Sequence, residues 1–385
     1  PYCPDSCELF ERVRDLPGAV LLDSSYPHTN SGRYDIISAA PSVLDLVFPG
    51  GGATAAQCEH FFTELRHCHG SLYGDTGAAS LDIPFCGGLI GYIGYDCGNQ
   101  LHQVSPPGAP QAMPAVHLAA YDWGLVQDHL LQRAVLVAHP RMRDSERKDL
   151  LARLLQPVTR RGRPFRLDTP FCSNFEASGY RSAFERIQAY IQAGDCYQVN
   201  LAQRFSSTFS GDPWLAYREL RSAAAAPFSA YMDLPGGNTL MSLSPERFIS
   251  LHGNHVETSP IKGTRPRYTD PGADALAAGE LRNSEKDRAE NLMIVDLLRN
   301  DLGRNCIPGT IHVDRLFEVQ SYPTVHHLVS TISGELAAQR GPAELLRDSF
   351  PGGSITGAPK RRAMQIIAEL EPDPRQIYCG SVVYI

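Results

Sequence analysis

The sequence predicts a mixed α+β protein, and three observations lead to this prediction. The first 150 residues alternate short β-like runs with turns that contain Gly and Pro. Two regular amphipathic helical patterns follow, at residues 178–193 and 285–302. The glycine-rich run at 85–96 lies within aromatic, β-like sequence, whereas a dinucleotide-binding fold needs such glycines between a strand and a helix.

The composition is that of a large globular chain. With 385 residues, 43% hydrophobic and 20% charged, the chain can form one large domain or two lobes. The net charge is 35 − 42 = −7, which disfavours binding to nucleic acid. No apolar run is as long as a membrane span, and no signal peptide is expected at the start. The ten cysteines lack paired metal-type spacing, which predicts reduced thiols in a cytoplasmic protein.

Changes in composition divide the chain into three regions. Residues 1–155 form a predicted N-terminal lobe, and residues 179–385 form a predicted second region. The polar residues 156–178, with prolines at 157, 164 and 170, are the predicted connection. In the first region we expect four strands and then a helix, at 19–24, 33–41, 115–121, 133–138 and 141–155.

The second region is predicted to contain the more regular helices. Ser178 is a candidate cap for the helix at 178–193, on which Phe184 and Ile187 share a face. The helix at 285–302 has Leu292, Val295, Leu298 and Leu302 near one stripe. The other expected elements are a strand at 196–205, a helix at 212–225, strands at 228–234, 239–243 and 322–330, and a helix at 361–369.

The stretch from Ser244 to Thr264 contains the strongest chemical signal. Its alternating residues predict a hairpin that turns at Gly253–Asn254, with Glu246 and Lys262 near the ends of the strands. Pro260 and Gly263 flank the lysine and define its backbone. If burial lowers its pKa, such a lysine can act as a nucleophile, although a lysine at a strand end is more often a solvated surface residue.

This stretch, together with motifs from residue 193 to residue 368, resembles the chorismate-utilising enzymes. Pro260–Thr264, in particular, resembles the aminodeoxychorismate synthases, whereas anthranilate synthases typically have alanine at the position of Lys262. The resemblance implies an anthranilate-synthase-like α+β fold, with two lobes of antiparallel sheets faced by helices. It also implies conversion of chorismate and ammonia to 4-amino-4-deoxychorismate, for para-aminobenzoate and folate synthesis.

The resemblance also implies roles for individual residues. Lys262 is the expected nucleophile, Glu246 the general acid and base, and His327 an assistant near the leaving hydroxyl. Glu290 corresponds to a ligand of Mg²⁺, a cation that prefers oxygen ligands and retains water. The residues expected to bind substrate are Gln198, Thr264, Gly353, Ser354, Gly357 and Lys360.

Gln198 bears on the choice of reaction. Relatives that add water to chorismate have a lysine base at the matching position, and an amide cannot deprotonate water. A water-adding reaction is therefore disfavoured, although Gln198 could simply pair with backbone.

A second site is implied at the end of the first strand, where the resemblance corresponds to the tryptophan pocket of anthranilate synthase. Bound tryptophan could be structural or regulatory, and an ordinary strand end is the simpler interpretation. The candidate residues are Asp23, Ser24, Tyr34, Pro227, Phe228, Ser229 and Tyr231.

The resemblance further implies two partner proteins and a continuation of the chain. A separate glutamine amidotransferase subunit would supply ammonia, and a separate lyase would act on the product. Family members continue beyond the position of Ile385, where an arginine and a second acidic metal ligand are expected. Two alternatives stay open: an anthranilate synthase component I, and a non-catalytic tryptophan-binding relative.

Overall fold

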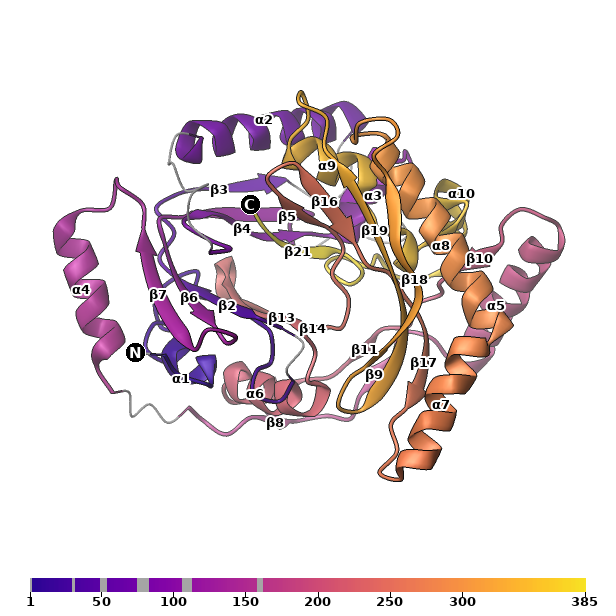
Figure 1. Cartoon of the computed structure of the whole chain (residues 1–385), viewed down its shortest axis with the longest axis horizontal. Coiled ribbons are helices and arrows are strands. Elements are labelled where there is room, and N and C mark those ends of the chain that lie inside the picture. The colour runs from indigo at the N-terminus through magenta and orange to yellow at the C-terminus, as the bar shows by residue number, and fades with distance from the viewer. Residues whose placement is uncertain (1, 30–31, 49–53, 75–82, 106–112, 158–161) are drawn as a thin grey trace.

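The computed structural model describes the whole chain except residues 1, 30–31, 49–53, 75–82, 106–112 and 158–161. It confirms the mixed α+β prediction, with three large antiparallel sheets and helices on their outer faces (Figure 1).

The first sheet has six strands in the order β14-β13-β1-β2-β6-β7. Four strands come from the first 140 residues, and two come from beyond residue 227. Helices α1 (Ser6–Phe10), α4 (Asp144–Leu155) and α6 (Pro213–Ala224) contribute buried side chains to the core against this sheet. The strands are β1 (Val20–Asp23), β2 (Tyr34–Ser38), β6 (Trp123–Asp128), β7 (Arg133–Ala138), β13 (Phe228–Leu234) and β14 (Asn238–Ser244).

The second sheet has the order β21-β4-β5-β3 and is covered by helix α2 (Ala55–Tyr73), seen above it in Figure 1. Helix α3 (Tyr95–Leu101) follows β4 and packs against α2. Side chains of the first and second sheets, including Val20, Met232, Ile90 and Tyr92, share one buried cluster. The strands are β3 (Val43–Phe48), β4 (Gly88–Ile93), β5 (Val116–Tyr121) and β21 (Ser381–Tyr384).

The third sheet carries the predicted hairpin. Its order is β15-β16-β19-β17, and β18 also pairs with β19. Helices α7 (Pro271–Asn283) and α8 (Glu285–Gly303) pack on it. The strands are β15 (Ser250–His252), β16 (His255–Thr258), β17 (Ile261–Pro266), β18 (His312–Ser321) and β19 (Val325–Glu335).

The remaining elements surround one end of this sheet. Helix α9 (Pro342–Ser349) packs against α2 and α8. The segment after α9 contains η3 (Gly353–Ile355) and β20 (Gly357–Ala358), and leads into α10 (Lys360–Leu370). Strand β10 (Gln198–Val199), which follows helix α5 (Ala177–Gln192), pairs with β20.

The two large regions of the sequence are interleaved in space. Strands β13 and β14 complete the first sheet and β21 completes the second, so both sheets contain strands from 1–155 and from 179–385. The described part of the connection has structure of its own. Its strands β8 (Arg166–Leu167) and β9 (Cys172–Ser173) pair with β12 (Phe209–Ser210) and β11 (Phe205–Ser206).

Several expectations about individual elements were wrong. Helices α2 and α3 and strand β6 were not expected, and the strand expected at 196–205 is reduced to β10 and the start of β11. Glu176, not Ser178, occupies the cap position of α5. Phe184 is 51% exposed, so it does not share the buried face of Ile187. Leu292 is 45% exposed and lies outside the buried stripe of α8.

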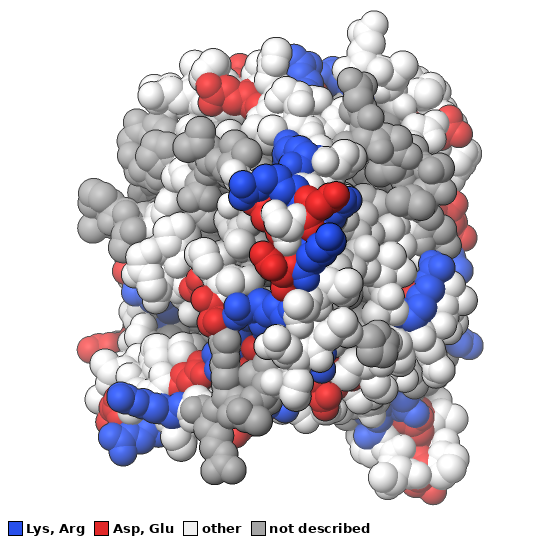
Figure 2. Space-filling model, turned by 90° about the vertical axis from the view of Figure 1, so that its left-hand side faces the viewer, with Lys and Arg blue, Asp and Glu red and all other residues white. Residues whose placement is uncertain are grey.

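Charged side chains of both signs are mixed on one side of the molecule. Figure 2 shows, on the side where α4 lies, positive and negative side chains next to one another. Ion pairs Arg143–Glu146 and Arg147–Asp144 belong to this mixed surface. Among the described helices, none combines the length and apolar character needed to span a bilayer.

Helix α8 allows a matched test of packing. Ser284 caps it by accepting a hydrogen bond from the Asp287 backbone N–H at 3.2 Å, and Leu298 is only 3% exposed, in the core against the third sheet. We expect Leu298→Ala to reduce the free energy of unfolding by about 2–4 kcal/mol, because it leaves a cavity. Leu292→Ala, on the exposed face, should change it by about 0.5 kcal/mol or less. Urea denaturation measures both, and equal losses would contradict the burial pattern.

Candidate active site

Lys262 lies at a point where the regular pairing of strand β17 is interrupted. The pairing of β17 with β19 shifts register between Ile261 and Thr264, so Lys262 and Gly263 lie in a β-bulge. Gly263 has a φ of +82°, and a Cβ there would lie 2.9 Å from the Cβ of Asp287. Glycine is therefore required next to the lysine both by the backbone angle and by the approach of α8.

Lys262, Glu246 and Ser354 form the centre of the site. The Lys262 Nζ donates to the Ser354 carbonyl at 2.8 Å. Burial lowers the pKa of Lys262, although the negative charges of Glu246 and Glu290 oppose this shift. Burial raises the pKa of Glu246, opposed by hydrogen bonds from the Ser354 side chain and the Ile261 backbone and by the charge of Lys262. Both shifts favour the uncharged forms, a neutral amine and a protonated carboxyl.

The segment from Gly352 to Pro359, which we call the substrate loop, approaches its neighbours closely through its glycines. A Cβ on Gly353 would lie 2.4 Å from the Cδ2 atom of Leu297 on α8. Gly357 has a φ of +132°, and a Cβ there would lie 2.1 Å from the Gln198 carbonyl. The predicted residues Gly353, Ser354 and Gly357 therefore form one wall, which packs between α8 and β10.

Gln198 lies beside this wall on β10, where it pairs with Ala358. Its side-chain Oε1 is buried and has no hydrogen-bond partner within the described part of the chain. A buried acceptor left without a partner is costly, so a donor on a bound molecule or a water would stabilise it.

His327 lies on β19, opposite Thr264 of β17. Its Nδ1 is 2.9 Å from the Thr264 hydroxyl, and burial lowers its pKa, opposed by a hydrogen bond with the Gly263 backbone. The adjacent His326 is buried on the other face of the strand, with its Nε2 3.0 Å from Asp274. The two side chains therefore lie on opposite faces of β19, as the alternation of a strand predicts, and a role for His327 near the leaving hydroxyl remains a prediction.

Glu290 is on α8, near enough for its charge to act on Lys262. Its carboxylate has a 3.8 Å ion pair with exposed Lys286. No cluster of three or more His, Cys, Asp or Glu suited to a metal is found among the described residues. Magnesium often binds through one or two carboxylates, with water and substrate oxygens completing its shell. Glu290 fits such an open site and does not form a closed protein cage.

The structure gives Lys360 different partners from those expected. Its Nζ donates to Asp301 of α8 at 2.6 Å and to the Ser349 carbonyl at 2.9 Å. Both side chains of this ion pair are buried. Burial lowers the pKa of Lys360 and raises that of Asp301, and their mutual attraction opposes both shifts. Because the amine already has an internal carboxylate, these contacts do not support the predicted contact with a substrate carboxylate.

The residues predicted to bind tryptophan gather at the end of β1. Asp23 pairs in register with Ser229 of β13. The Asp23 carboxylate is already occupied, because it accepts hydrogen bonds from Arg221 at 2.5 Å and Tyr217 at 2.8 Å. The Ser24 hydroxyl is buried and has no partner among the described residues.

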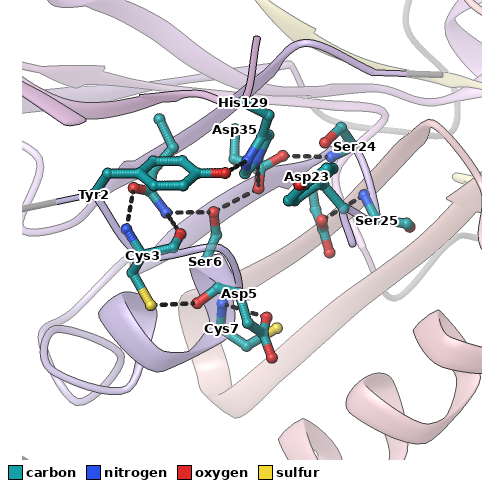
Figure 3. A network of polar contacts seen from close by, with 12 residues as sticks. Tyr2, Cys3, Asp5, Ser6, Cys7, Asp23, Ser24, Ser25, Asp35 and His129 are labelled. Atoms are coloured by element: carbon teal, nitrogen blue, oxygen red, sulfur yellow. Dashed lines mark hydrogen bonds and ion pairs between the residues drawn. The ribbon is translucent and has the colours of Figure 1, made fainter. Parts of the chain in front are cut away.

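Figure 3 shows this strand end beside a polar network that the sequence did not suggest. Asp35 accepts from the Ser24 backbone N–H at 2.6 Å and from the Ser6 hydroxyl at 2.5 Å, and lies 2.7 Å from His129. The hydroxyl of Tyr2 lies 2.9 Å from the same histidine.

The other candidates have separate surroundings. Tyr231 packs with the ring of Trp214 at 4.9 Å, and Arg247 lies over the ring of Phe228 at 5.9 Å. Arg33 lies over the ring of Tyr34 at 4.5 Å, and Pro227 is buried. Tryptophan binding remains a prediction.

The sequence analysis missed Asn200 and Arg375. The Asn200 Nδ2 donates to the Ser354 carbonyl at 2.8 Å, so this oxygen accepts hydrogen bonds from both Asn200 and Lys262. Asn200 stands two residues after Gln198, and in extended chain such residues share a face. That spacing was the available signal. No local pattern indicated Arg375, which donates to carbonyls in two other segments of the chain.

Comparison with known sequences identifies the family. A profile of the chorismate binding enzymes matches residues 52–385. The chain belongs to the chorismate binding enzyme family. It is 43% identical over 393 residues to the aminodeoxychorismate synthase component 1 of Klebsiella aerogenes, covering 100% of this chain and 86% of that protein. It is 37% identical over 320 residues to an anthranilate synthase component 1 of Streptomyces coelicolor, covering 78% and 63% of the two chains.

Among solved structures, the anthranilate synthase component I of Streptococcus pneumoniae superposes with a TM-score of 0.79. The match has 27% sequence identity and covers 92% of this chain and 80% of that one. The anthranilate-synthase-like fold that the sequence predicted is therefore confirmed.

The environment of Lys262 predicts its titration. Because burial lowers its pKa, the pH midpoint for labelling by an amine-reactive reagent should lie below the ordinary value for lysine, about 10.4. Glu246→Gln should lower this midpoint further, because the carboxylate charge raises the pKa of Lys262. Peptide mass spectrometry over a pH series measures the midpoint, and exposed Lys148 serves as the reference in the same sample. A midpoint that rises in Glu246→Gln would contradict the proposed electrostatics.

Proposed function

We propose that this protein is the synthase component that converts chorismate and ammonia to 4-amino-4-deoxychorismate. The observation that carries the proposal is the partly buried pair of Lys262 and Glu246, in which desolvation favours a neutral amine beside a protonated carboxyl. The similarity to the aminodeoxychorismate synthase components supports this choice over other reactions of the family. The amination requires one group able to attack and another able to protonate a departing hydroxyl.

Lys262 is the proposed nucleophile. Its neutral amine adds at C2 of chorismate while both conjugated double bonds of the ring shift, from C1=C2 to C1=C6 and from C5=C6 to C4=C5, and the C4–O bond breaks. The electron pair leaves with the hydroxyl oxygen, and the amine loses a proton, so one water is released for each adduct. Ammonia then adds at C4, both double bonds shift back, and the lysine leaves C2; the added nitrogen loses one proton and the departing amine gains one. Covalent catalysis of this kind replaces one difficult displacement by two easier ones.

Glu246 is the proposed acid and base. Hydroxide is a poor leaving group, so a proton from the carboxyl group must reach the C4 oxygen as it departs. The resulting carboxylate can then take a proton from the incoming ammonia. His327 is on the strand next to Lys262, and its lowered pKa favours the neutral ring, which can orient the C4 hydroxyl by hydrogen bonding.

Gln198 favours ammonia over water as the second nucleophile. Its amide has no basic group with which to deprotonate water, whereas ammonia is already nucleophilic. The buried, unpartnered Oε1 of Gln198 can accept a hydrogen bond from bound ammonia or from a substrate hydroxyl.

Enzymes of this family are generally Mg²⁺-dependent, and Glu290 is the residue that would hold the ion here. When bound, the ion supplies positive charge to a substrate carboxylate. This assignment is supported by the partly buried Glu290 carboxylate on α8, which is near enough to Lys262 for its charge to act on that amine.

Component 1 relatives carry a name that implies a second subunit. The amination needs ammonia, and we propose that a glutamine amidotransferase subunit supplies it and that a lyase acts on the product. We also infer a cytoplasmic location, where ten free cysteines would stay reduced.

Removal of the amine tests the nucleophile. Lys262→Ala should reduce the rate with ammonia to near the detection limit, because the variant lacks the amine that forms the adduct. Mass spectrometry of the intact wild-type protein with chorismate, Mg²⁺ and ammonium should show a chorismate-derived increase in mass. Peptide mass spectrometry after digestion should locate this increase on the peptide that contains Lys262. A wild-type rate in Lys262→Ala would refute the nucleophile role. The appearance of 2-aminobenzoate would instead identify an anthranilate synthase.

Loss of the Glu246 carboxyl group should strongly reduce activity but leave the fold intact. We expect Glu246→Gln to lower kcat by roughly 10²–10⁴-fold, the usual contribution of a general acid. The measurement is steady-state kinetics with product chromatography, and far-ultraviolet circular dichroism controls for folding. A decrease of less than about threefold would assign proton transfer to another group, with His327→Gln as the next variant.

A further inference from the structure

The carbonyl oxygen of Ser354 is the point where the substrate loop meets the proposed nucleophile. It accepts hydrogen bonds from Lys262 at 2.8 Å and from the Asn200 side chain at 2.8 Å. The position of this one oxygen therefore defines where the amine lies. The groups that fix Ser354 also fix Lys262.

Asn200 is itself held from two directions. Its backbone N–H donates to the Thr356 carbonyl at 3.0 Å, so both its backbone and its side chain bind the substrate loop. Its own carbonyl accepts from the guanidinium of Arg375 at 2.5 Å.

Arg375 connects the loop to the rest of the site. Its Nη1 donates to the Ile355 carbonyl at 2.9 Å, next to Ser354 in the chain. Glu371 holds the guanidinium through hydrogen bonds of 2.7 and 2.9 Å, and also accepts from the Ala202 backbone N–H at 2.8 Å. The guanidinium lies over the ring of Tyr95 at 4.7 Å. With these partners around a buried cation, Arg375 holds both Ile355 and Asn200 in place.

A separate set of contacts joins the two ends of the loop. Lys360, directly after the loop, donates to the Ser349 carbonyl just before its start. Asp301 holds the same amine to α8, the helix that also carries Glu290. The loop is thus fixed at its base and near its centre.

We propose that Asn200 and Arg375 are positioning residues for the amination, which hold the Ser354 carbonyl against Lys262 and keep water away from its amine. This inference rests on the proposed nucleophile role of Lys262. Arginine near a site for a dicarboxylate substrate would ordinarily be assigned to substrate binding. Arg375 instead donates hydrogen bonds to an internal acid and to two backbone carbonyls, and these contacts favour a positioning role.

The primary test is Asn200→Ala, because it removes the side-chain hydrogen bond without leaving a buried charge. We expect the labelling midpoint of Lys262 to rise towards that of an ordinary lysine, as water enters beneath the loosened loop. We expect kcat to fall about 10-fold or more, since small displacements of reacting groups are costly. The KM for chorismate should change by less than about threefold, because a positioning residue does not contact substrate.

The matched control is Asn174→Ala. Asn174 has a side-chain hydrogen bond of 3.1 Å to Asp373 and lies outside the loop, so its loss should leave both the midpoint and kcat unchanged. Arg375→Lys is a second test, since it keeps the positive charge beside Glu371 but loses the fork that reaches two carbonyls. It should shift the Lys262 midpoint in the same direction as Asn200→Ala.

Two results would overturn the proposal. An unchanged labelling midpoint in both variants would show that neither residue controls the surroundings of Lys262. A raised KM with unchanged kcat would assign these residues to substrate binding. The labelling measurement needs no substrate, so a shifted midpoint in a protein that does not aminate chorismate would refute the proposed function and leave the positioning role intact.

Discussion

The partial burial of Lys262 is the constraint on which the rest of the proposed site depends. An exposed lysine is protonated at neutral pH and cannot attack carbon, so the fold must enclose this amine without giving it a strong permanent counter-ion. The bulge in β17 directs the side chain towards the substrate loop, and a backbone carbonyl receives it there. A neutral oxygen holds the amine in place but favours its charged form less than a carboxylate would.

Close packing of backbone around the amine explains the glycines. The substrate loop can cover Lys262 only if it packs between α8 and β10, and side chains at Gly353 and Gly357 would collide with Leu297 and with the Gln198 carbonyl. Gly263 has the same role next to the lysine, where it packs against Asp287 of α8. Lack of space excludes a side chain at all three positions, and at Gly263 and Gly357 the positive φ also favours glycine.

The predictable and unpredictable parts of the molecule differ in physical origin. Periodicity is local, so the strand β1, the helix α8 and the hairpin around Gly253 could be read from the sequence. Helix α2 was not predicted, because its 19 residues lie in a region where short β-like runs suggested strands throughout. The interleaving of strands β13 and β21 into the N-terminal sheets depends on pairings over long sequence separations, which no local pattern encodes.

The same distinction applies to the site. Lys262, Glu246 and Ser354 were found because they belong to recognisable motifs, and the structure brings these three together. Lys360 was also in a motif, yet its amine is bound by Asp301, 59 residues away in sequence. A sequence motif identifies a residue as a candidate, but the residues that it contacts in the fold are needed to infer its role.

Those partners are required by electrostatics. Removing a cation from water costs several kcal/mol, so a buried Lys or Arg persists only beside an acid or several acceptors. Lys360 has Asp301, Arg375 has Glu371, and Arg221 has Asp23. These three cations are therefore already neutralised by internal carboxylates when an anionic substrate arrives. Lys262 differs from them, since its amine has a backbone carbonyl as its hydrogen-bond partner instead of a carboxylate, and this difference supports its proposed role as the nucleophile.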